Sequence, residues 1–213
     1  MIIRFKNVLP SPMQDMDVSA SEVWQSDFEL HSKGRYLINA ASGKGKSTFV
    51  NILYGLRHDY TGFVEFDGKT LEKLHISDWT SLRTEKLSMV FQSLDLFPNL
   101  TVMENILVNN SLTDFKTEKE IGEHLAVLEI DNLRDKHAGT LSMGQQQRVA
   151  IVRALCQPFD WLLLDEPFSH LDTHNTMLAW RLIHNEVIQQ DAAVMMTTLG
   201  EDYAIEPTKT LRL

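Results

Sequence analysis

The stretch Asn39-Ala40-Ala41-Ser42-Gly43-Lys44-Gly45-Lys46-Ser47-Thr48 decides the fold of this chain. It follows a short strand predicted over 35–39 and opens a helix predicted over 46–57. In that context glycines let backbone N–H groups turn inward around an anion, and the helix start adds partial positive charge. The Lys46 ammonium is expected to reach the outer phosphates, and the Ser47 hydroxyl is expected to bind Mg²⁺. The sequence therefore predicts a phosphate-binding loop, with residues 40–48 as its nucleotide contacts.

One position departs from the formal pattern of such a loop, because Ala40 stands where the pattern has glycine. Alanine is the smallest replacement, but it tolerates positive φ poorly, so we expect a slightly different loop entrance. The alternative is an ordinary glycine-rich turn capped by Ser47. The Gly-x-Gly-Lys-Ser-Thr core, flanked by a strand and a helix, argues against that alternative.

Residues Trp161-Leu162-Leu163-Leu164-Asp165-Glu166-Pro167 form a second informative stretch, an apolar strand that ends in two carboxylates. A phosphate loop alone does not distinguish kinases, GTPases and ATPases, and this acidic pair narrows the choice. We expect Asp165 to hold Mg²⁺ through water and Glu166 to act as general base toward the attacking water. An ordinary acidic turn would explain the pair in isolation. Beside a phosphate loop, the pair indicates nucleotide hydrolysis.

Charge and composition argue against several other classes of function. The 213 residues include 29 acidic and 20 basic side chains, for a formal net charge of −9, which disfavours nucleic-acid binding and adsorption to anionic lipid. The single cysteine, Cys156, fits a reducing compartment. No apolar run approaches the ~18 residues that span a bilayer, and the opening MIIRFKNVLP lacks a signal-peptide core. We therefore expect a cytoplasmic protein with no nucleic-acid partner, which reaches a membrane only through another subunit.

The order of predicted elements indicates an α/β fold in one domain over 1–213, built around a parallel sheet. Further strands are predicted over 2–8, 23–31, 63–66, 161–164, 192–197 and 208–212, with a hairpin turn at Asp67-Gly68. Helices are predicted from a Thr117–Glu120 capping box, over about 144–157, and over 173–190. The helical middle of the chain would be an inserted lobe over 93–148.

A third stretch, Leu141-Ser142-Met143-Gly144-Gln145-Gln146-Gln147-Arg148, precedes the acidic strand. Ser142 and Gln145 have the spacing of a capping box, which would start a helix in any protein. An ordinary capping box does not explain the glutamine run or the helix that follows it, Val149-Ala150-Ile151-Val152-Arg153-Ala154-Leu155. With these residues the chain resembles the ATP-binding cassette (ABC) family, whose signature is Leu-Ser-Gly-Gly-Gln. Gln92 resembles the family's Q-loop glutamine, and Ser169-His170-Leu171-Asp172 resembles its D-loop.

The resemblance covers essentially the whole chain. It implies a P-loop NTPase (RecA-like) core over 1–92 and 149–213 with an N-terminal antiparallel β subdomain, and an inserted α-helical signature subdomain over 93–148. It also implies a paired arrangement. Two ATP molecules would bind between two head-to-tail copies of the cassette. Each site would join the phosphate loop of one copy to Ser142, Gly144 and Gln145 of the other, whose helix N-terminus completes the anion hole. Asp172 of the D-loop would contact the nucleotide site as well. One cassette alone would have half a site and would hydrolyse ATP poorly.

The same resemblance assigns the reacting centre. Glu166 and Gln92 would act in catalysis together with Thr198, which stands where the family has a switch histidine. Threonine donates one hydrogen bond, but it is shorter than histidine and cannot become cationic, which predicts slow hydrolysis by the isolated chain. Mg²⁺ would be held by Ser47, Gln92 and Asp165.

Two further departures from the family pattern concern the nucleotide. Met143 replaces the first signature glycine, so either the approach to the γ-phosphate is looser or the thioether points away from it. The aromatic residue that stacks on adenine in the family is not evident. Residues 9–17 offer prolines and methionines, and Trp24 lies too late in the chain. We therefore expect unusual recognition of the base.

Together the motifs predict an ATP-binding and ATP-hydrolysing subunit of an ABC transporter, with ATP and Mg²⁺ as cofactors. It would dimerise on ATP, as a homodimer or with another cassette, and drive a separate transmembrane permease from the inner face of the cell membrane. The alternative is a nucleotide-gated binding module with little or no ATPase activity, which Met143 and Thr198 favour and Glu166 opposes. The sequence does not name the transported substrate or its direction.

The loop over 94–102 is unusually apolar, and two interpretations of it stay open. It either packs the core of the helical lobe or forms the groove that receives a coupling helix of the permease. Residues 97–105, Phe-Pro-Asn-Leu-Thr-Val-Met-Glu-Asn, resemble the ABC group that serves lipoprotein release, macrolide export and cell division.

Overall fold

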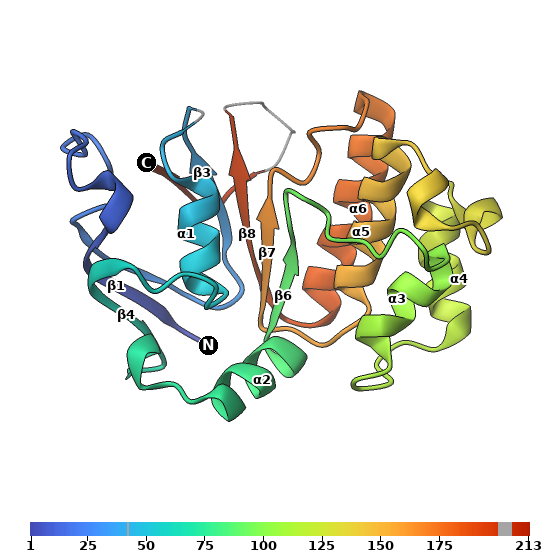
Figure 1. Ribbon diagram of the computed structural model, residues 1–213, viewed down its shortest axis with the longest axis horizontal. Helices are drawn as coiled ribbons and strands as arrows, with labels where there is room; N and C mark the ends of the chain where they lie inside the picture. The colour runs from blue at the N-terminus through green and yellow to red at the C-terminus, as the bar shows by residue number, and fades with distance from the viewer. Residues whose placement is uncertain (42, 200–205) are drawn as a thin grey trace.

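The computed structural model describes residues 1–41, 43–199 and 206–213. Its central layer is a parallel sheet with the strand order β6-β7-β8-β3-β9 (Figure 1). These strands are β6 (Leu87–Val90), β7 (Trp161–Asp165), β8 (Ala193–Thr198), β3 (Arg35–Asn39) and β9 (Lys209–Arg212). Every residue of β7 and β8 is buried, as expected for central parallel strands that are covered on both faces. The predicted parallel α/β sheet is confirmed.

Helices cover both faces of this sheet. They are α1 (Lys46–Leu53), α2 (Ile76–Glu85), α3 (Val102–Asn110), α4 (Glu118–Val127), α5 (Met143–Leu155) and α6 (Thr173–Gln189), with short 3₁₀ turns η1 (Ser11–Met13), η2 (Leu71–Lys73), η3 (Asp131–Leu133) and η4 (Ala138–Thr140). Trp161 and Leu163 of β7 join the apolar core that includes α1, whereas Leu162 and Leu164 join the core that includes α5 and α6. Among the helices of the described residues, none is long and apolar enough to cross a bilayer.

A second, antiparallel sheet has the strand order β2-β1-β4-β5, which confirms the predicted β subdomain. Its strands are β1 (Ile3–Pro10), β2 (Asp27–Leu30), β4 (Tyr60–Phe66) and β5 (Lys69–Thr70). The predicted hairpin at Asp67-Gly68 joins β4 to β5, with the left-handed φ values of 49° and 81° that a tight two-residue turn needs. The strand predicted from Val23 begins only at Asp27. The Ser21 hydroxyl accepts from the N–H groups of Val23 and Trp24 and holds them in a turn.

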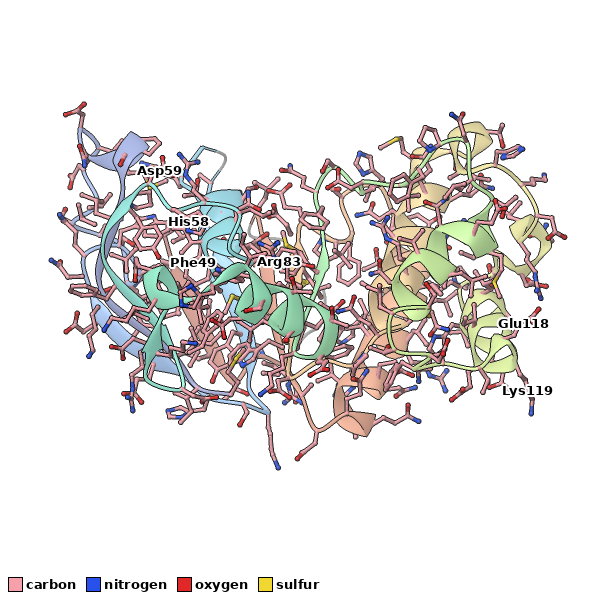
Figure 2. All side chains as sticks on the ribbon, turned by 60° about the horizontal axis from the view of Figure 1, so that its bottom comes forward. Phe49, His58, Asp59, Arg83, Glu118 and Lys119 are labelled. Atoms are coloured by element: carbon pink, nitrogen blue, oxygen red, sulfur yellow. The ribbon has the colours of Figure 1, made fainter. Side chains whose placement is uncertain are left out.

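The helix α1 ends at Leu53, earlier than the predicted residue 57, and Arg83 of α2 explains why (Figure 2). The Arg83 guanidinium donates to the carbonyl oxygens of Tyr54 at 3.1 Å and Gly55 at 3.0 Å, which satisfies acceptors left open at the helix end. Gly55 turns the chain with a φ of 71°. The helix α2 was not predicted, because Trp79 is its one fully buried residue and the apolar stripe in its sequence is weak.

The helices α3, α4 and α5 lie on the side of the parallel sheet away from the antiparallel sheet (Figure 1). The predicted capping box starts α4, with the Glu120 N–H donating to Thr117 Oγ1 at 3.3 Å and the Thr117 N–H donating to the Glu120 carboxylate at 2.8 Å. The helix predicted over 144–157 is α5. These elements form the inserted helical part, and its exact boundaries at 93 and 148 stay a prediction.

In the apolar loop over 94–102, some residues fit the core-packing interpretation and one does not. Leu94 and Val102 are buried in the core of the helical part, and Leu96 packs against it. Phe97 is half exposed. Core packing therefore explains most of the apolar residues in this loop, and Phe97 is the large apolar side chain that packing does not explain.

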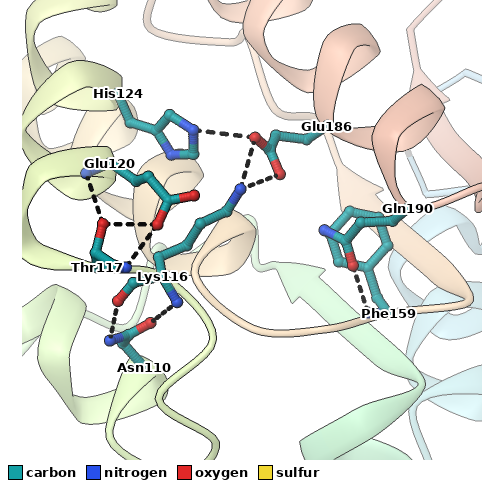
Figure 3. Close-up of polar contacts among 8 residues, drawn as sticks. All are labelled: Asn110, Lys116, Thr117, Glu120, His124, Phe159, Glu186 and Gln190. Carbon is teal, nitrogen blue, oxygen red and sulfur yellow. Dashed lines mark hydrogen bonds and ion pairs between the residues drawn. The ribbon is translucent and has the colours of Figure 1, made fainter.

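A buried ionic cluster joins the helical part to α6 (Figure 3). The Lys116 ammonium and His124 Nε2 each lie 3.0 Å from the Glu186 carboxylate. Asn110 holds the Lys116 backbone through hydrogen bonds of 2.8 and 2.9 Å. Burial by itself would raise the pKa of Glu186, but the hydrogen bonds from His124 and Lys116 together hold that pKa below its ordinary value. The pairing lets these charged groups lie inside the protein.

Candidate functional site

The phosphate-binding loop connects β3 to α1, beyond the carboxyl end of a central strand. Gly43 and Gly45 have φ values of 77° and 96°, and Gly45 is the residue that precedes α1. A Cβ at Gly45 would lie 2.0 Å from the methyl carbon of Met13, so conformation and space both favour glycine there. The predicted contact Ser42 lies outside the described residues.

Ala40 fits the loop entrance as it stands. It does not adopt a left-handed φ, so its methyl group adds no backbone strain, and the slightly different loop entrance stays a prediction. Its N–H donates to the Thr198 carbonyl at 3.3 Å, which continues the pairing of β3 with β8. The carbonyl oxygens of Ala40 and Ala41 accept from the Lys46 ammonium at 3.0 and 3.4 Å. The backbone thereby fixes the lysine across the loop.

Side chains from three distant segments meet beside this loop. The Lys46 ammonium lies 3.2 Å from one oxygen of Glu166, and Gln92 Nε2 donates to the other at 3.4 Å. Ser47 Oγ donates to Gln92 Oε1 at 3.3 Å. Lys46 is almost fully buried and Glu166 is mostly buried, so their charges are only weakly screened by water. The fold thus brings four of the predicted site residues into one contact network.

Asp165 ends β7 next to this network. Its side chain is buried, and one carboxylate oxygen accepts from the Thr197 hydroxyl at 2.7 Å. Within the described residues no cluster of three or more histidine, cysteine or acidic side chains could hold a metal ion alone. Mg²⁺ commonly binds through one or two carboxylates together with substrate phosphates. The oxygens of Ser47, Gln92 and Asp165 match that kind of site.

An open pocket of about 300 Å³ lies over the loop. Its lining residues are Pro12, Met13, Met16, Gly43, Gly45, Lys46, Ser47, Thr48, Gln92 and Glu166. Trp24 is buried, and its indole N–H donates to the Lys44 carbonyl at 3.4 Å. It therefore supports the loop from inside the protein and offers no face to a base. In the part of the chain that the structure describes, methionine and proline line this pocket, and no aromatic residue that could stack on adenine lines it.

The signature stretch starts α5 as predicted. Ser142 Oγ accepts from the Gln145 N–H at 3.3 Å, and Gln145 Oε1 accepts from the Ser142 N–H at 3.0 Å. Neither side chain lines the pocket of its own chain. Met143 is 48% exposed, so about half of this residue is accessible to solvent. Ser142 and Gln145, which are expected to contact a phosphate, therefore lie apart from the phosphate loop of the same copy.

The profile of the family described as "ABC transporter" matches residues 23–169, which include the phosphate loop, the signature stretch and the acidic strand. The chain belongs to the ABC transporter family. It is an ATP-binding cassette, an ATP-hydrolysing subunit of that family. The recognition from sequence is confirmed at the level of the family. The lipoprotein, macrolide and cell-division group suggested by residues 97–105 stays a prediction.

Two relatives illustrate the extent of similarity. The cassette is 31% identical over 214 residues to "Uncharacterized ABC transporter ATP-binding protein YclH" of Bacillus subtilis, and the match covers 98% of the cassette and 88% of the relative. It is 36% identical over 154 residues to "Glycine betaine/carnitine transport ATP-binding protein GbuA" of Listeria monocytogenes. That match covers 71% of the cassette and 39% of the relative, so the cassette corresponds to only part of the longer protein.

Solved structures show the same fold. One is described as the dimeric structure of MJ0796, a bacterial ABC transporter cassette, with a TM-score of 0.85 and 26% identity over 99% of the cassette and 94% of that chain. A second dimeric structure of MJ0796, in a post-hydrolysis state bound to ADP and Pi, has a TM-score of 0.84 and 26% identity. The predicted P-loop NTPase fold with β and helical subdomains is therefore confirmed.

The D-loop of the cassette packs directly against the start of the signature helix. Asp172 caps α6 by accepting from the Asn175 N–H at 2.8 Å, and this hydrogen bond lowers the pKa of Asp172. A Cβ at Gly144 would lie 2.8 Å from the His170 carbonyl oxygen. Gly144 therefore serves two needs, an open helix N-terminus and close contact with the D-loop.

We expect Gly144→Ala to lower the free energy of unfolding by about 1–3 kcal/mol, because the added methyl group overlaps the D-loop backbone. Urea unfolding measures this change. Gly122→Ala is the matched control, since Gly122 lies in α4 and an added Cβ would meet nothing within 4 Å. There alanine should stabilise the cassette by about 0.5–1 kcal/mol through its higher helix propensity. A Gly144→Ala protein as stable as Gly122→Ala would contradict the proposed close packing.

Thr198, the third predicted catalytic residue, is the last residue of β8, is 1% exposed and does not line the pocket. Its neighbour Thr197 points toward Asp165, and successive side chains of a strand point to opposite faces. The Thr198 side chain therefore leaves β8 on the face opposite to Asp165. Its catalytic role stays a prediction.

The sequence analysis missed two buried residues that contact the backbone of Glu166. Thr197 Oγ1 accepts from the Glu166 N–H at 3.0 Å, and Gln147 Nε2 donates to the Glu166 carbonyl at 3.2 Å. Gln147 lies in the glutamine run of the signature, which was a usable signal. The sequence contains nothing that separates Thr197 from Thr198, because only the sheet decides which of them faces Asp165.

Proposed function

We propose that the cassette works as one of two head-to-tail copies that close on two ATP molecules with Mg²⁺ and drive a separate permease. The observation that carries this proposal is that Lys46 and Glu166 meet in one pocket while Ser142 and Gly144 stand outside it. A second copy would supply the missing signature helix, whose N-terminus attracts the γ-phosphate. The dimeric structures of MJ0796 support this arrangement.

Mg²⁺ would be held by Ser47, Gln92 and Asp165 together with the phosphates of ATP. A hydroxyl, an amide carbonyl and a carboxylate offer the hard oxygen atoms that this ion prefers. The hydrogen bond between Ser47 and Gln92 keeps two of these groups side by side before ATP arrives. When bound, the ion neutralises charge on the phosphates and orients them.

Glu166 would take a proton from the attacking water while the water oxygen bonds to the γ-phosphorus and ADP leaves. In the described arrangement the Lys46 ammonium pairs with this carboxylate at 3.2 Å. The negative phosphates of ATP would compete for Lys46 and leave Glu166 able to accept the proton. Gln92, which donates to Glu166 at 3.4 Å, would keep the carboxylate oriented during that exchange.

Two departures from the family pattern favour slow turnover by the isolated cassette. Thr198 offers a shorter, uncharged donor than the family's switch histidine, and Met143 places a thioether at the signature. They also motivate the alternative function, a module that closes on ATP and barely hydrolyses it. Glu166, held beside Lys46 and Gln92, favours hydrolysis over that alternative.

The permease partner is supported by the relatives, which include transport ATP-binding proteins, and by the exposed Phe97. Leu94 and Leu96 anchor the loop in the core of the helical part, so Phe97 is presented from a fixed support. An apolar side chain held in this way suits contact with a helix of a membrane subunit. Such contact would hold the cassette at the inner face of the cell membrane.

The proposal is tested by phosphate release from the purified cassette at saturating ATP, with Mg²⁺ or with EDTA. We expect release to require Mg²⁺ and the rate per chain to rise with protein concentration, because each site needs two copies. A rate per chain that does not change with concentration would contradict the paired site. ATP-dependent dimers with no phosphate release above background would favour the non-hydrolysing module.

A further inference from the structure

The backbone of Glu166 has an uncommon conformation that something must hold. Its φ is 49°, in the left-handed region that residues other than glycine rarely adopt. Such a residue persists when its surroundings restrain it, and residues of this kind gather at functional sites. Here the carboxylate of the same residue reaches Lys46 and Gln92, so the backbone angle sets the direction of the side chain.

On the N–H side of Glu166 the restraint is Thr197. This side chain is fully buried in β8, where Thr197 pairs in register with Asp165 of β7. Its hydroxyl oxygen accepts from the Glu166 N–H at 3.0 Å and its proton is donated to the Asp165 carboxylate at 2.7 Å. One hydroxyl therefore fixes two consecutive acidic residues relative to each other.

On the carbonyl side of Glu166 the restraint is Gln147 of the signature helix α5. Gln147 is 1% exposed, and its Nε2 donates to the Glu166 carbonyl at 3.2 Å. Its Oε1 accepts from the His170 N–H of the D-loop at 2.9 Å, and His170 Nδ1 lies 3.2 Å from the same oxygen. The side-chain amide of this signature-helix residue thus contacts both Glu166, which follows the acidic strand, and the D-loop.

We propose that Gln147 is a positioning residue that sets the direction of Glu166 and couples it to the signature helix and the D-loop. Thr197 holds the other side of the same residue and acts with it. This inference rests on the proposed role of Glu166 as general base.

Because misplacement of a reacting group by about 1 Å can cost roughly 10²-fold in rate, we expect Gln147→Leu to lower kcat about 10²-fold. Leucine has a similar size and removes both hydrogen bonds of the amide. ATP affinity should stay within about threefold of wild type, because Gln147 does not line the pocket. Thr197→Val should act in the same way, and Thr197→Ser, which keeps the hydroxyl, should restore kcat.

The matched control is Gln146→Leu, one residue earlier in α5. Gln146 also donates its amide to a backbone carbonyl, that of Leu141 at 3.0 Å, but it does not touch Glu166. Its turnover should stay near that of wild type. Thermal unfolding of each variant shows whether it is folded. If Gln147→Leu unfolds, Gln147→Met keeps an unbranched, uncharged side chain of similar length without the donor to Glu166, and it should show the same loss of kcat.

A double variant separates this inference from the proposed function. In a Glu166→Gln protein, Gln147→Leu should lower turnover no further, because it acts through the group already removed. Wild-type turnover in Glu166→Gln alone would reject the general base itself. Turnover within threefold of wild type in both Gln147→Leu and Thr197→Val, with Glu166→Gln impaired, would overturn the positioning role. So would equal losses of kcat in Gln147→Leu and Gln146→Leu.

Discussion

Replacing Glu166 with glutamine is expected to slow ATP hydrolysis about 10²–10⁴-fold and to trap an ATP-bound dimer of the cassette. Glutamine keeps the shape of the side chain but cannot accept the proton of the attacking water. The groups expected to bind phosphate, Lys46 and the loop amides, are unchanged. Closure of the dimer should therefore survive while the step that reopens it is lost.

The structure sharpens this expectation. In the described arrangement Glu166 is the carboxylate that pairs with the Lys46 ammonium at 3.2 Å. Glutamine removes that competitor for Lys46, so ATP affinity should stay equal to wild type or increase. The variant thus separates binding from hydrolysis.

Phosphate release and size-exclusion chromatography with ATP and Mg²⁺ measure the two outcomes. Glu123→Gln is a suitable control, because Glu123 lies on the exposed face of α4 and pairs with Lys119 at the surface. A Glu166→Gln protein that stays monomeric at millimolar ATP would contradict the paired arrangement. One that hydrolyses ATP at the wild-type rate would show that another group takes the proton.

Replacing Lys46 with alanine is expected to weaken ATP binding about 10- to 150-fold. Charge-assisted hydrogen bonds of the kind that an ammonium makes to phosphates contribute roughly 1.5–3 kcal/mol, which gives that range. The backbone carbonyls of Ala40 and Ala41 hold this ammonium across the loop before the nucleotide arrives. Little ordering of the lysine is therefore needed on binding.

Isothermal calorimetry with ATP and Mg²⁺ measures this loss of affinity. Lys33→Ala is the control, because it removes the same charge from an exposed lysine that pairs with Asp191. Its ATP affinity should match that of wild type. Since Lys46→Ala also leaves Glu166 without its partner, thermal unfolding should accompany the titration. Folded Lys46→Ala protein with wild-type ATP affinity would refute the role of this loop in binding phosphate.

Elements with a strong local pattern could be predicted, and elements without one could not. The apolar run before Asp165 is a strand because every residue of it is buried between two layers of helices. The Thr117–Glu120 box starts α4 because both hydrogen bonds form within one turn. By contrast, α2 buries only Trp79 fully and Leu82 in part, and most of its other side chains are polar. Its apolar pattern is too weak to predict a helix for this reason.

The chemistry of the phosphate loop follows from its amino-acid sequence alone. That loop is contiguous, its glycines must adopt left-handed φ values, and its lysine follows directly on the turn. The same holds for the capping box at Ser142, whose two partners are three residues apart. Local geometry suffices for such features, because the residues that interact are neighbours in the chain.

The direction of the Glu166 carboxylate, by contrast, depends on contacts that form only in the folded chain. Its partners Gln147 and Thr197 come from a helix and a strand that lie on either side of it in the sequence. Which of two adjacent threonines faces Asp165 depends on the register of β8 against β7, and the pairing of strands far apart in the chain sets that register. Similarly, the burial of Trp24 beneath the loop follows from the packing of the antiparallel sheet on α1. These contacts join distant segments, so their energies depend on the assembled core, which no local pattern encodes.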